Sequence, residues 1–180
     1  MIVIYRTTLL AACLLLTACQ TAPVRLTLAN SQHDHPGALA TRTCRINLLP
    51  VKDSRSNQQT LGVAGNVPVL ADDVSQWVYR GLVSGLTQAG HQVVDAAKGQ
   101  DLQVAIKLAY LRSLPLRLHA TVSIDVGMAR TGKTRYTQTF RAVGEKNNWA
   151  NGDGEIMEVL NIALNNAVAD MAADIGRACR

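Results

Sequence analysis

The segment Gly127–Thr134 carries the most specific chemical pattern in the chain. Its residues match G-x-x-x-x-G-K-[ST], the phosphate-binding loop of many nucleotide-binding proteins. That loop binds phosphate only where a strand precedes it and a helix follows, because the loop amides and the helix N-terminus hold the anion. Here the next residues, 135–140, are β-branched and aromatic, which is typical of a strand. The segment therefore predicts a hairpin turn and no nucleotide.

Residues able to bind a metal or to act in catalysis are present but are not arranged for either task. His33-Asp34-His35 places two imidazoles close together, whereas a metal site needs three or four ligands held in fixed positions. A nucleophilic Ser or Cys needs an adjacent base, and the chain has no G-x-S-x-G elbow. We therefore expect no catalytic residue, no metal and no cofactor, and the sequence does not predict an enzyme.

Cys19 is the cysteine with the clearest chemical context. Arg6 supplies a positive charge, and an apolar run from Leu9 to Leu16 follows it, as in a signal peptide. Leu16-Thr17-Ala18-Cys19 is similar to the bacterial lipobox, in which an apolar residue and two small residues precede the cysteine that accepts diacylglycerol. We expect residues 1–18 to be removed and Cys19 to be lipidated. The alternatives are an ordinary secretory signal and an N-terminal membrane helix, for which the apolar run is short.

The residue after Cys19 bears on the choice of membrane. In enterobacterial lipoproteins an aspartate at that position retains the protein in the inner membrane, and here the residue is Gln20. By that resemblance we expect the outer membrane, with the domain facing the periplasm. Each buried CH₂ of the acyl chains contributes roughly 0.8 kcal/mol, so two or three chains anchor a protein stably.

Cys44 and Cys179 are expected to form a disulfide. They are the cysteines that remain in the mature chain besides Cys19, and the periplasm is an oxidising compartment. Cys44 lies at the start of the first expected strand and Cys179 just after the last helix, and a two-layer fold can bring such ends together. The alternative is two unrelated cysteines, one of them a free thiol near the C-terminus.

The composition is that of one folded domain with a tail. The chain has 180 residues, of which 48% are hydrophobic and 17% are charged, so a core is expected. Its net charge of +5 comes without any dense run of Lys and Arg, so nucleic acid is not an expected partner. Residues 19–40 mix polar residues, Pro and Gly without periodicity and predict a flexible tether. Residues 41–180 are expected to form the single domain.

Hydrophobic periodicity predicts the elements of this domain. In chain order they are a strand at 43–51, a long loop at 52–71 that contains a short extended piece at 61–64, a helix at 74–90 capped by Asp72 or Asp73, a short strand at 91–95, three alternating strands at 102–110, 118–128 and 136–142, and a helix at 153–175. We expect an α+β fold, in which an antiparallel sheet of about four strands carries two helices on one face, in the order β-α-(β)-β-β-β-α.

This layout resembles the YajG-type family of uncharacterised Gram-negative lipoproteins. The matching segments are the lipobox at 16–19, Leu49–Arg55, Leu61-Gly62, the helix 74–90, and the sheet and helix from 101 to 175. The resemblance implies attachment to the outer membrane and a non-enzymatic role, and it supplies no functional residue beyond the lipidated cysteine. The pair Cys44 and Cys179 is not a feature of that family.

The expected function is therefore a non-catalytic binding or assembly module of the cell envelope. Its partner would be an envelope protein or a cell-wall component. The candidate surfaces are the polar face of the sheet and the loop 52–71, represented by Lys107, Asp125, Arg141, Asp53 and Arg55. The alternative is an auxiliary lipoprotein of an envelope lipid-transport system, which would need an apolar cavity between helices and sheet to carry lipid.

Overall fold

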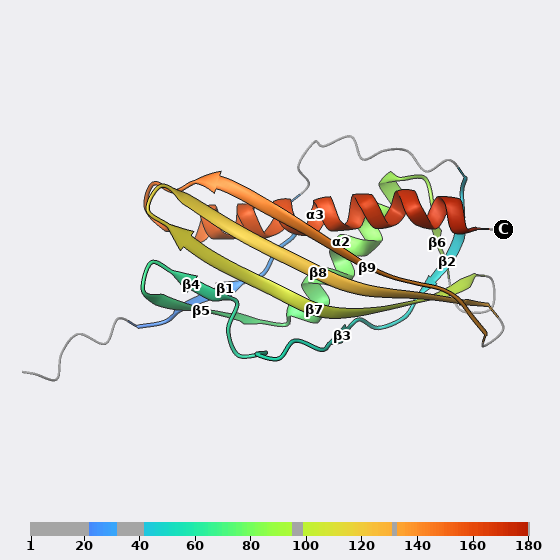
Figure 1. Cartoon of the computed structure of the whole chain (residues 1–180), viewed down its shortest axis with the longest axis horizontal. Coiled ribbons are helices and arrows are strands. Elements are labelled where there is room, and N and C mark those ends of the chain that lie inside the picture. Colours follow the sequence, from blue (N-terminus) through green and yellow to red (C-terminus); the bar gives the residue numbers. More distant parts are fainter. Residues whose placement is uncertain (1–21, 32–41, 95–98, 131–132, 180) are drawn as a thin grey trace, which may run out of the picture.

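Three long antiparallel strands make up the largest part of the sheet, and the last of them in the chain is one of its edges. In the computed structural model, which describes residues 22–31, 42–94, 99–130 and 133–179, they are β7 (Gln100–Leu114), β8 (Arg117–Arg130) and β9 (Lys133–Asn147) (Figure 1). Each strand alternates apolar and polar residues because one face packs against helices. The three predicted alternating strands are confirmed, and all of them are longer than predicted. A strand follows Lys133, so the P-loop pattern belongs to a hairpin.

The edge of β7 that does not pair with β8 pairs instead with three short strands, which follow one another along the chain. They are β2 (Arg45–Leu48), β3 (Lys52–Asp53) and β4 (Gly62–Ala64), and all three run parallel to β7. The segment expected to be a loop at 52–71 therefore contributes to the sheet. The extended piece expected at 61–64 corresponds to β4. β3 has only two residues and shows no alternation, so periodicity does not reveal it.

The sheet is completed by three further strands. β5 (Val67–Asp72) forms a hairpin with β4, β1 (Val24–Thr27) pairs parallel with β5, and β6 (Gln92–Val93) pairs parallel with β2. Within the described residues the sheet has nine strands and mixed directions. The prediction of a four-stranded antiparallel sheet was therefore wrong in strand number and in the direction of the short strands, whereas the α+β class is confirmed.

β1 lies within the segment 19–40 that was expected to be a flexible tether. Leu26 and Leu28 are buried, and the side-chain amide of Asn161 donates to the carbonyl of Ala29 over 3.0 Å. Residues 24–29 are thus part of the domain, which corrects the predicted boundary at residue 41. Residues 19–21 and 32–40 of the expected tether lie outside the described residues.

The two helices lie on the same face of the sheet (Figure 1). They are α2 (Val74–Gln88) and α3 (Asp153–Ala178), and they pack against each other. A Cβ atom at Gly85 of α2 would lie 2.3 Å from Val168 Cγ1 of α3, so only glycine allows this approach. No helix in the described part of the chain is both long and apolar enough to cross a bilayer.

A β-bulge in β7 changes which of its side chains face the helices. The pairing with β8 shifts between Ile106 and Leu108, which leaves Lys107 as the extra residue. After the bulge Ala109 and Leu111 are buried, and Tyr110 is 43% exposed. The strict alternation predicted for 102–110 would place Leu108 and Tyr110 on the buried face together with Leu102, Val104 and Ile106, and it is therefore wrong beyond Ile106.

Candidate functional site

An open groove of about 330 Å³ lies between the start of α2 and the residues that follow β2. Its volume is at the lower end of the range of ligand sites, roughly 300–1,000 Å³. The lining combines apolar and polar side chains from two segments that are distant in sequence: Leu48, Pro50, Val51, Asp73, Ser75, Gln76 and Tyr79. Such a surface can bind a small apolar group or an extended segment of a partner.

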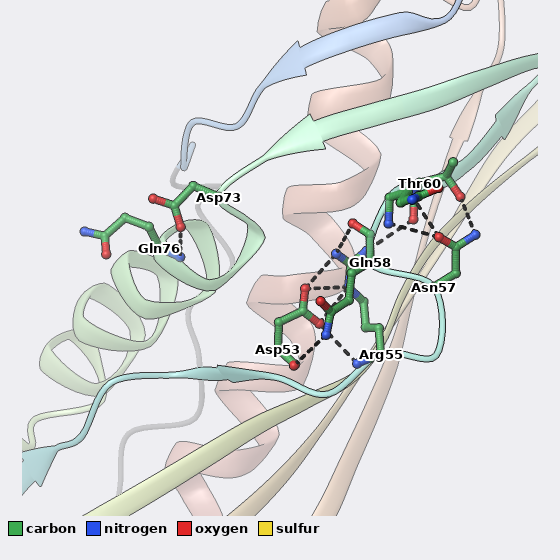
Figure 2. A network of polar contacts seen from close by, with 8 residues as sticks. Asp53, Arg55, Asn57, Gln58, Thr60, Asp73 and Gln76 are labelled. Carbon is green, nitrogen blue, oxygen red and sulfur yellow. Dashed lines mark hydrogen bonds and ion pairs between the residues drawn. The ribbon is translucent and has the colours of Figure 1, made fainter.

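Asp73 forms the N-cap of α2 at this groove. Its backbone has a φ of 52°, and its carboxylate accepts a hydrogen bond from the backbone N–H of Gln76 over 3.0 Å (Figure 2). Side-chain capping of this kind satisfies one of the free N–H groups at a helix start. The sequence predicted Asp72 or Asp73 as the cap, and the structure selects Asp73. Asp72 instead faces Arg25 at 3.3 Å on the surface.

Arg55 is the centre of a polar network in the loop after β3 (Figure 2). Its Nε and Nη2 donate to the two carboxylate oxygens of Asp53 at 3.0 and 2.8 Å. Nη1 donates to the carbonyl of Thr60 and Nη2 to that of Gln58, each over 3.2 Å. The Arg55 side chain is only 3% exposed. It stabilises the loop between β3 and β4 and does not offer its charge to a partner.

The contacts with Arg55 also change the pKa of the Asp53 carboxyl. Partial burial raises its pKa, but the hydrogen bonds and the positive charge of Arg55 together outweigh that effect and hold the pKa below its ordinary value. Because the pKa of Asp53 is lower in the folded protein than in the unfolded chain, its pairing with Arg55 stabilises the fold at pH values above the unfolded-state pKa. This stabilisation is lost as the pH falls through the folded-state pKa. The pair is therefore intact at neutral pH. Asp53 and Arg55 were predicted as partner-facing residues, and the structure pairs them with each other.

Lys107, Asp125 and Arg141 lie on the sheet face opposite the helices. Lys107 Nζ is 3.8 Å from Asp125 Oδ2, and the Thr139 hydroxyl donates to Asp125 Oδ1 over 2.6 Å. Arg141 is exposed and pairs with Ser123 in the adjacent row of the sheet. Lys107 and Asp125 thus face each other, Arg141 lies in the next row of the sheet, and Asp53 of β3 pairs with Ile106, the residue before Lys107. Exposed ion pairs of this kind contribute little stability, about 0–1 kcal/mol.

Cys44 and Cys179 form a disulfide in the structure, with their Cα atoms 6.1 Å apart. It links the residue before β2 to the C-cap of α3. The buried His91 lies at the same place, where Nδ1 accepts from the Cys44 N–H over 3.2 Å and Nε2 donates to the Ala172 carbonyl over 2.9 Å. Both ring nitrogens are used, so His91 has a structural role.

The remaining predicted groups lie in other regions. Cys19 with Leu16, Thr17 and Ala18, and the segment 33–35, fall outside the described residues. Among the residues that are described, no three His, Cys, Asp or Glu side chains are grouped as metal ligands. Sequence reasoning also missed Leu116 and Trp149, whose side chains are largely exposed. The available signal was a bulky apolar residue in each of two segments that lie between predicted elements.

Comparison with known proteins identifies the fold and not the family. No protein-family model matches the sequence, and no curated protein matches it. Protein XCC0632 from Xanthomonas campestris, of the family DUF330, is similar in structure with a TM-score of 0.57 and 11% identity, over 88% of this chain and 95% of that one. An uncharacterised protein is similar with a TM-score of 0.53 and 14% identity, over 86% of this chain and 99% of that one. At these identities the likeness shows a shared fold alone.

Proposed function

We propose that this chain is a lipoprotein anchored in the outer membrane through Cys19, and that its domain is a non-catalytic binding or assembly module facing the periplasm. The observation that carries the proposal is the sequence Leu16-Thr17-Ala18-Cys19 at the end of an apolar run. Membership of the YajG-type family belongs to the same proposal. The partner is an envelope protein or a cell-wall component.

The groove beside α2 is the surface that best supports binding. Its apolar lining comes from Leu48, Val51 and Tyr79, and Gln76 adds a polar group at the helix start. α2 also contacts β3, which leads into the loop stabilised by Arg55. A groove whose walls are already ordered loses little conformational entropy when a partner binds.

Lipid carriage is the alternative function, and the interior gives it less support. A carrier needs an apolar cavity between helices and sheet. In the described residues this space is occupied by large side chains that are fully buried, among them Trp77, Leu82, Leu118, Ile124 and Met128. Phospholipid that co-purifies in constant ratio with the protein after detergent exchange would favour the alternative.

Replacing Cys19 with alanine tests the anchor. We expect the Cys19→Ala chain to lose labelling by radioactive fatty acid and to leave the outer-membrane fraction, because no other residue in the lipobox can accept the lipid. The matched control is Cys13→Ala, which removes a cysteine from the apolar run and should leave labelling and fractionation unchanged. A Cys19→Ala chain that is still labelled and still sediments with the outer membrane would refute the proposal.

A photo-crosslinking residue at Gln76 tests the binding surface in living cells. We expect a discrete crosslinked partner from Gln76, which is exposed and lines the groove. Gln103, an exposed residue of β7, is the matched control on the opposite sheet face. Mass spectrometry of the adducts identifies the partner. Adducts from Gln103 and none from Gln76 would show that the groove is not the binding surface.

A further inference from the structure

Large apolar side chains are exposed at the end of the molecule where β7 turns into β8. Trp149 is 84% exposed and Leu116 is 78% exposed, and the neighbouring Leu114 is exposed as well. Tyr110 and Val143 are also exposed, but they lie further along the outer face, where both pair with Thr121, and the row of Arg112, His119 and Glu145 separates them from this end. Exposed apolar residues gathered in one place usually mark an interaction site.

The turn that carries Leu116 is joined to the loop that carries Trp149. The backbone N–H of Asn148 donates to the Leu116 carbonyl over 3.1 Å. The Ser113 hydroxyl donates to Asn151 Oδ1 over 2.8 Å, and the Asn148 side chain donates to the same oxygen over 2.9 Å. Leu116 and Trp149 therefore belong to one ordered unit, which we call the apolar tip.

Glu155 orders the backbone beside Trp149. Its carboxylate accepts hydrogen bonds from the backbone N–H groups of Ala150 and Gly152, each over 3.2 Å, and from that of Trp149 over 3.4 Å. The indole is thus presented to solvent from an ordered backbone. An apolar group held outward in this way is ready for binding without a further loss of backbone entropy.

The register of the sheet places the start of β1 at the same end as the apolar tip. Val24 pairs with Val69, Val69 with Gly62, and Gly62 with Leu111. The directions of these pairings make β1 antiparallel to β7, so the chain before Val24 approaches the end at which Leu116 lies. Figure 1 shows the start of β1 and the β7–β8 turn together at the left end of the molecule.

Chain length then limits the distance between the apolar tip and the proposed lipid anchor. Cys19 precedes Val24 by five residues, which can span at most roughly 17 Å. From Leu111 the strand β7 continues for three residues to Leu114, about 10 Å, and the turn that holds Leu116 follows directly. An acylated Cys19 would therefore keep this end of the domain next to the bilayer. The long tether that would have allowed any orientation is absent here because β1 belongs to the sheet.

We propose that Leu116 and Trp149 insert into the interfacial layer of the membrane that holds the Cys19 lipid. The inference rests on the proposed lipidation and adds an orientation, with the apolar tip on the membrane and the Cys44–Cys179 end away from it. Tryptophan is favoured at the interface because its ring is apolar and its N–H remains a hydrogen-bond donor. Apolar side chains that enter this layer strengthen attachment in proportion to the apolar area they bury.

Tryptophan fluorescence of the full mature lipoprotein tests this inference. The protein is reconstituted in vesicles of phosphatidylethanolamine and phosphatidylglycerol, with or without bromine on the acyl chains, which quenches tryptophan on contact. We expect a blue shift on reconstitution and a loss of emission in the brominated vesicles. Trp77 is fully buried in the protein and serves as the unquenched reference. In the Trp149→Phe variant the quenched component should disappear.

Two controls make the test decisive. Gln92→Trp in the Trp149→Phe background places the reporter in β6, next to the start of β2 at the other end of the sheet, and should show no quenching. Fatty-acid labelling of the same preparation reports the anchor separately. A labelled protein whose emission is equal in both kinds of vesicle would overturn the inference and leave the anchor standing, and an unlabelled one would overturn both. Blue-shifted but unquenched emission from a sedimenting dimer would assign the apolar tip to self-association and also overturn the inference.

Discussion

Replacing Trp77 with alanine is expected to lower the free energy of unfolding by about 3–5 kcal/mol. The side chain is fully buried between α2 and α3, and its removal leaves a cavity that the packed neighbours cannot fill. It also removes the donor to Asn161 Oδ1, a 3.0 Å hydrogen bond inside the core. A buried acceptor without its partner by itself costs roughly 1–3 kcal/mol, so we expect the total loss to lie in the upper part of the range of about 3–5 kcal/mol. Urea unfolding of the purified protein measures the change.

The matched control for this prediction is Trp149→Ala. Trp149 is 84% exposed, so its replacement should change the free energy of unfolding by no more than about 0.5 kcal/mol. The two tryptophans thus separate a role in the core from a role at the surface. Equal losses of unfolding free energy from both substitutions would contradict the burial of Trp77. They would also show that Trp149 contributes to the fold and does not act only at the surface.

Removing the disulfide is expected to have an effect of similar size. Cys44 and Cys179 are separated by 135 residues, so the bridge closes a loop that contains most of the domain. In the chain-entropy account such a bridge stabilises by up to about 5 kcal/mol, and native disulfides of small secreted domains typically contribute 2–5 kcal/mol. We expect the Cys44→Ala/Cys179→Ala variant to unfold at a correspondingly lower denaturant concentration.

The test of the disulfide includes a chemical count and a control. The denatured, unreduced protein should contain no free thiol from these two positions, and two free thiols would refute the bridge. A reductant should lower the unfolding midpoint of the native protein and leave that of the double alanine variant unchanged. Equal effects of the reductant on both would mean that the bridge does not account for the stability.

Long periodic segments were the part of the fold that sequence could predict. β7, β8, β9 and α3 each contain enough consecutive residues for the alternation or the helical stripe to repeat several times. α2 was predicted for the same reason, together with its N-cap at the sequence Asp72-Asp73. In these segments local preference and tertiary packing favour the same conformation, which makes the pattern visible.

The short strands and the bulge could not be obtained in this way. β1 has a brief alternation at Val24, Leu26 and Leu28, but its polar flanks gave it the composition of a linker. β3 has two residues and exists only because β7 provides a partner along its edge. The bulge at Lys107 depends on the pairing between β7 and β8, and it moved Tyr110 to the outer face.

The features of the candidate sites can be divided in the same way, into those set by local sequence and those set by tertiary contacts. Features that depend on neighbouring residues could be obtained from the sequence alone: the types of the main elements, the hairpin after Arg130 and the lipobox-like motif from which lipidation at Cys19 is proposed. Only the tertiary structure decided that Arg55 is buried against Asp53, that the groove joins Val51 to Tyr79, and that the apolar tip lies at the end where β1 begins. Each of these depends on residues far apart in the chain, and burial, charge pairing and orientation arise only when the fold brings such residues together.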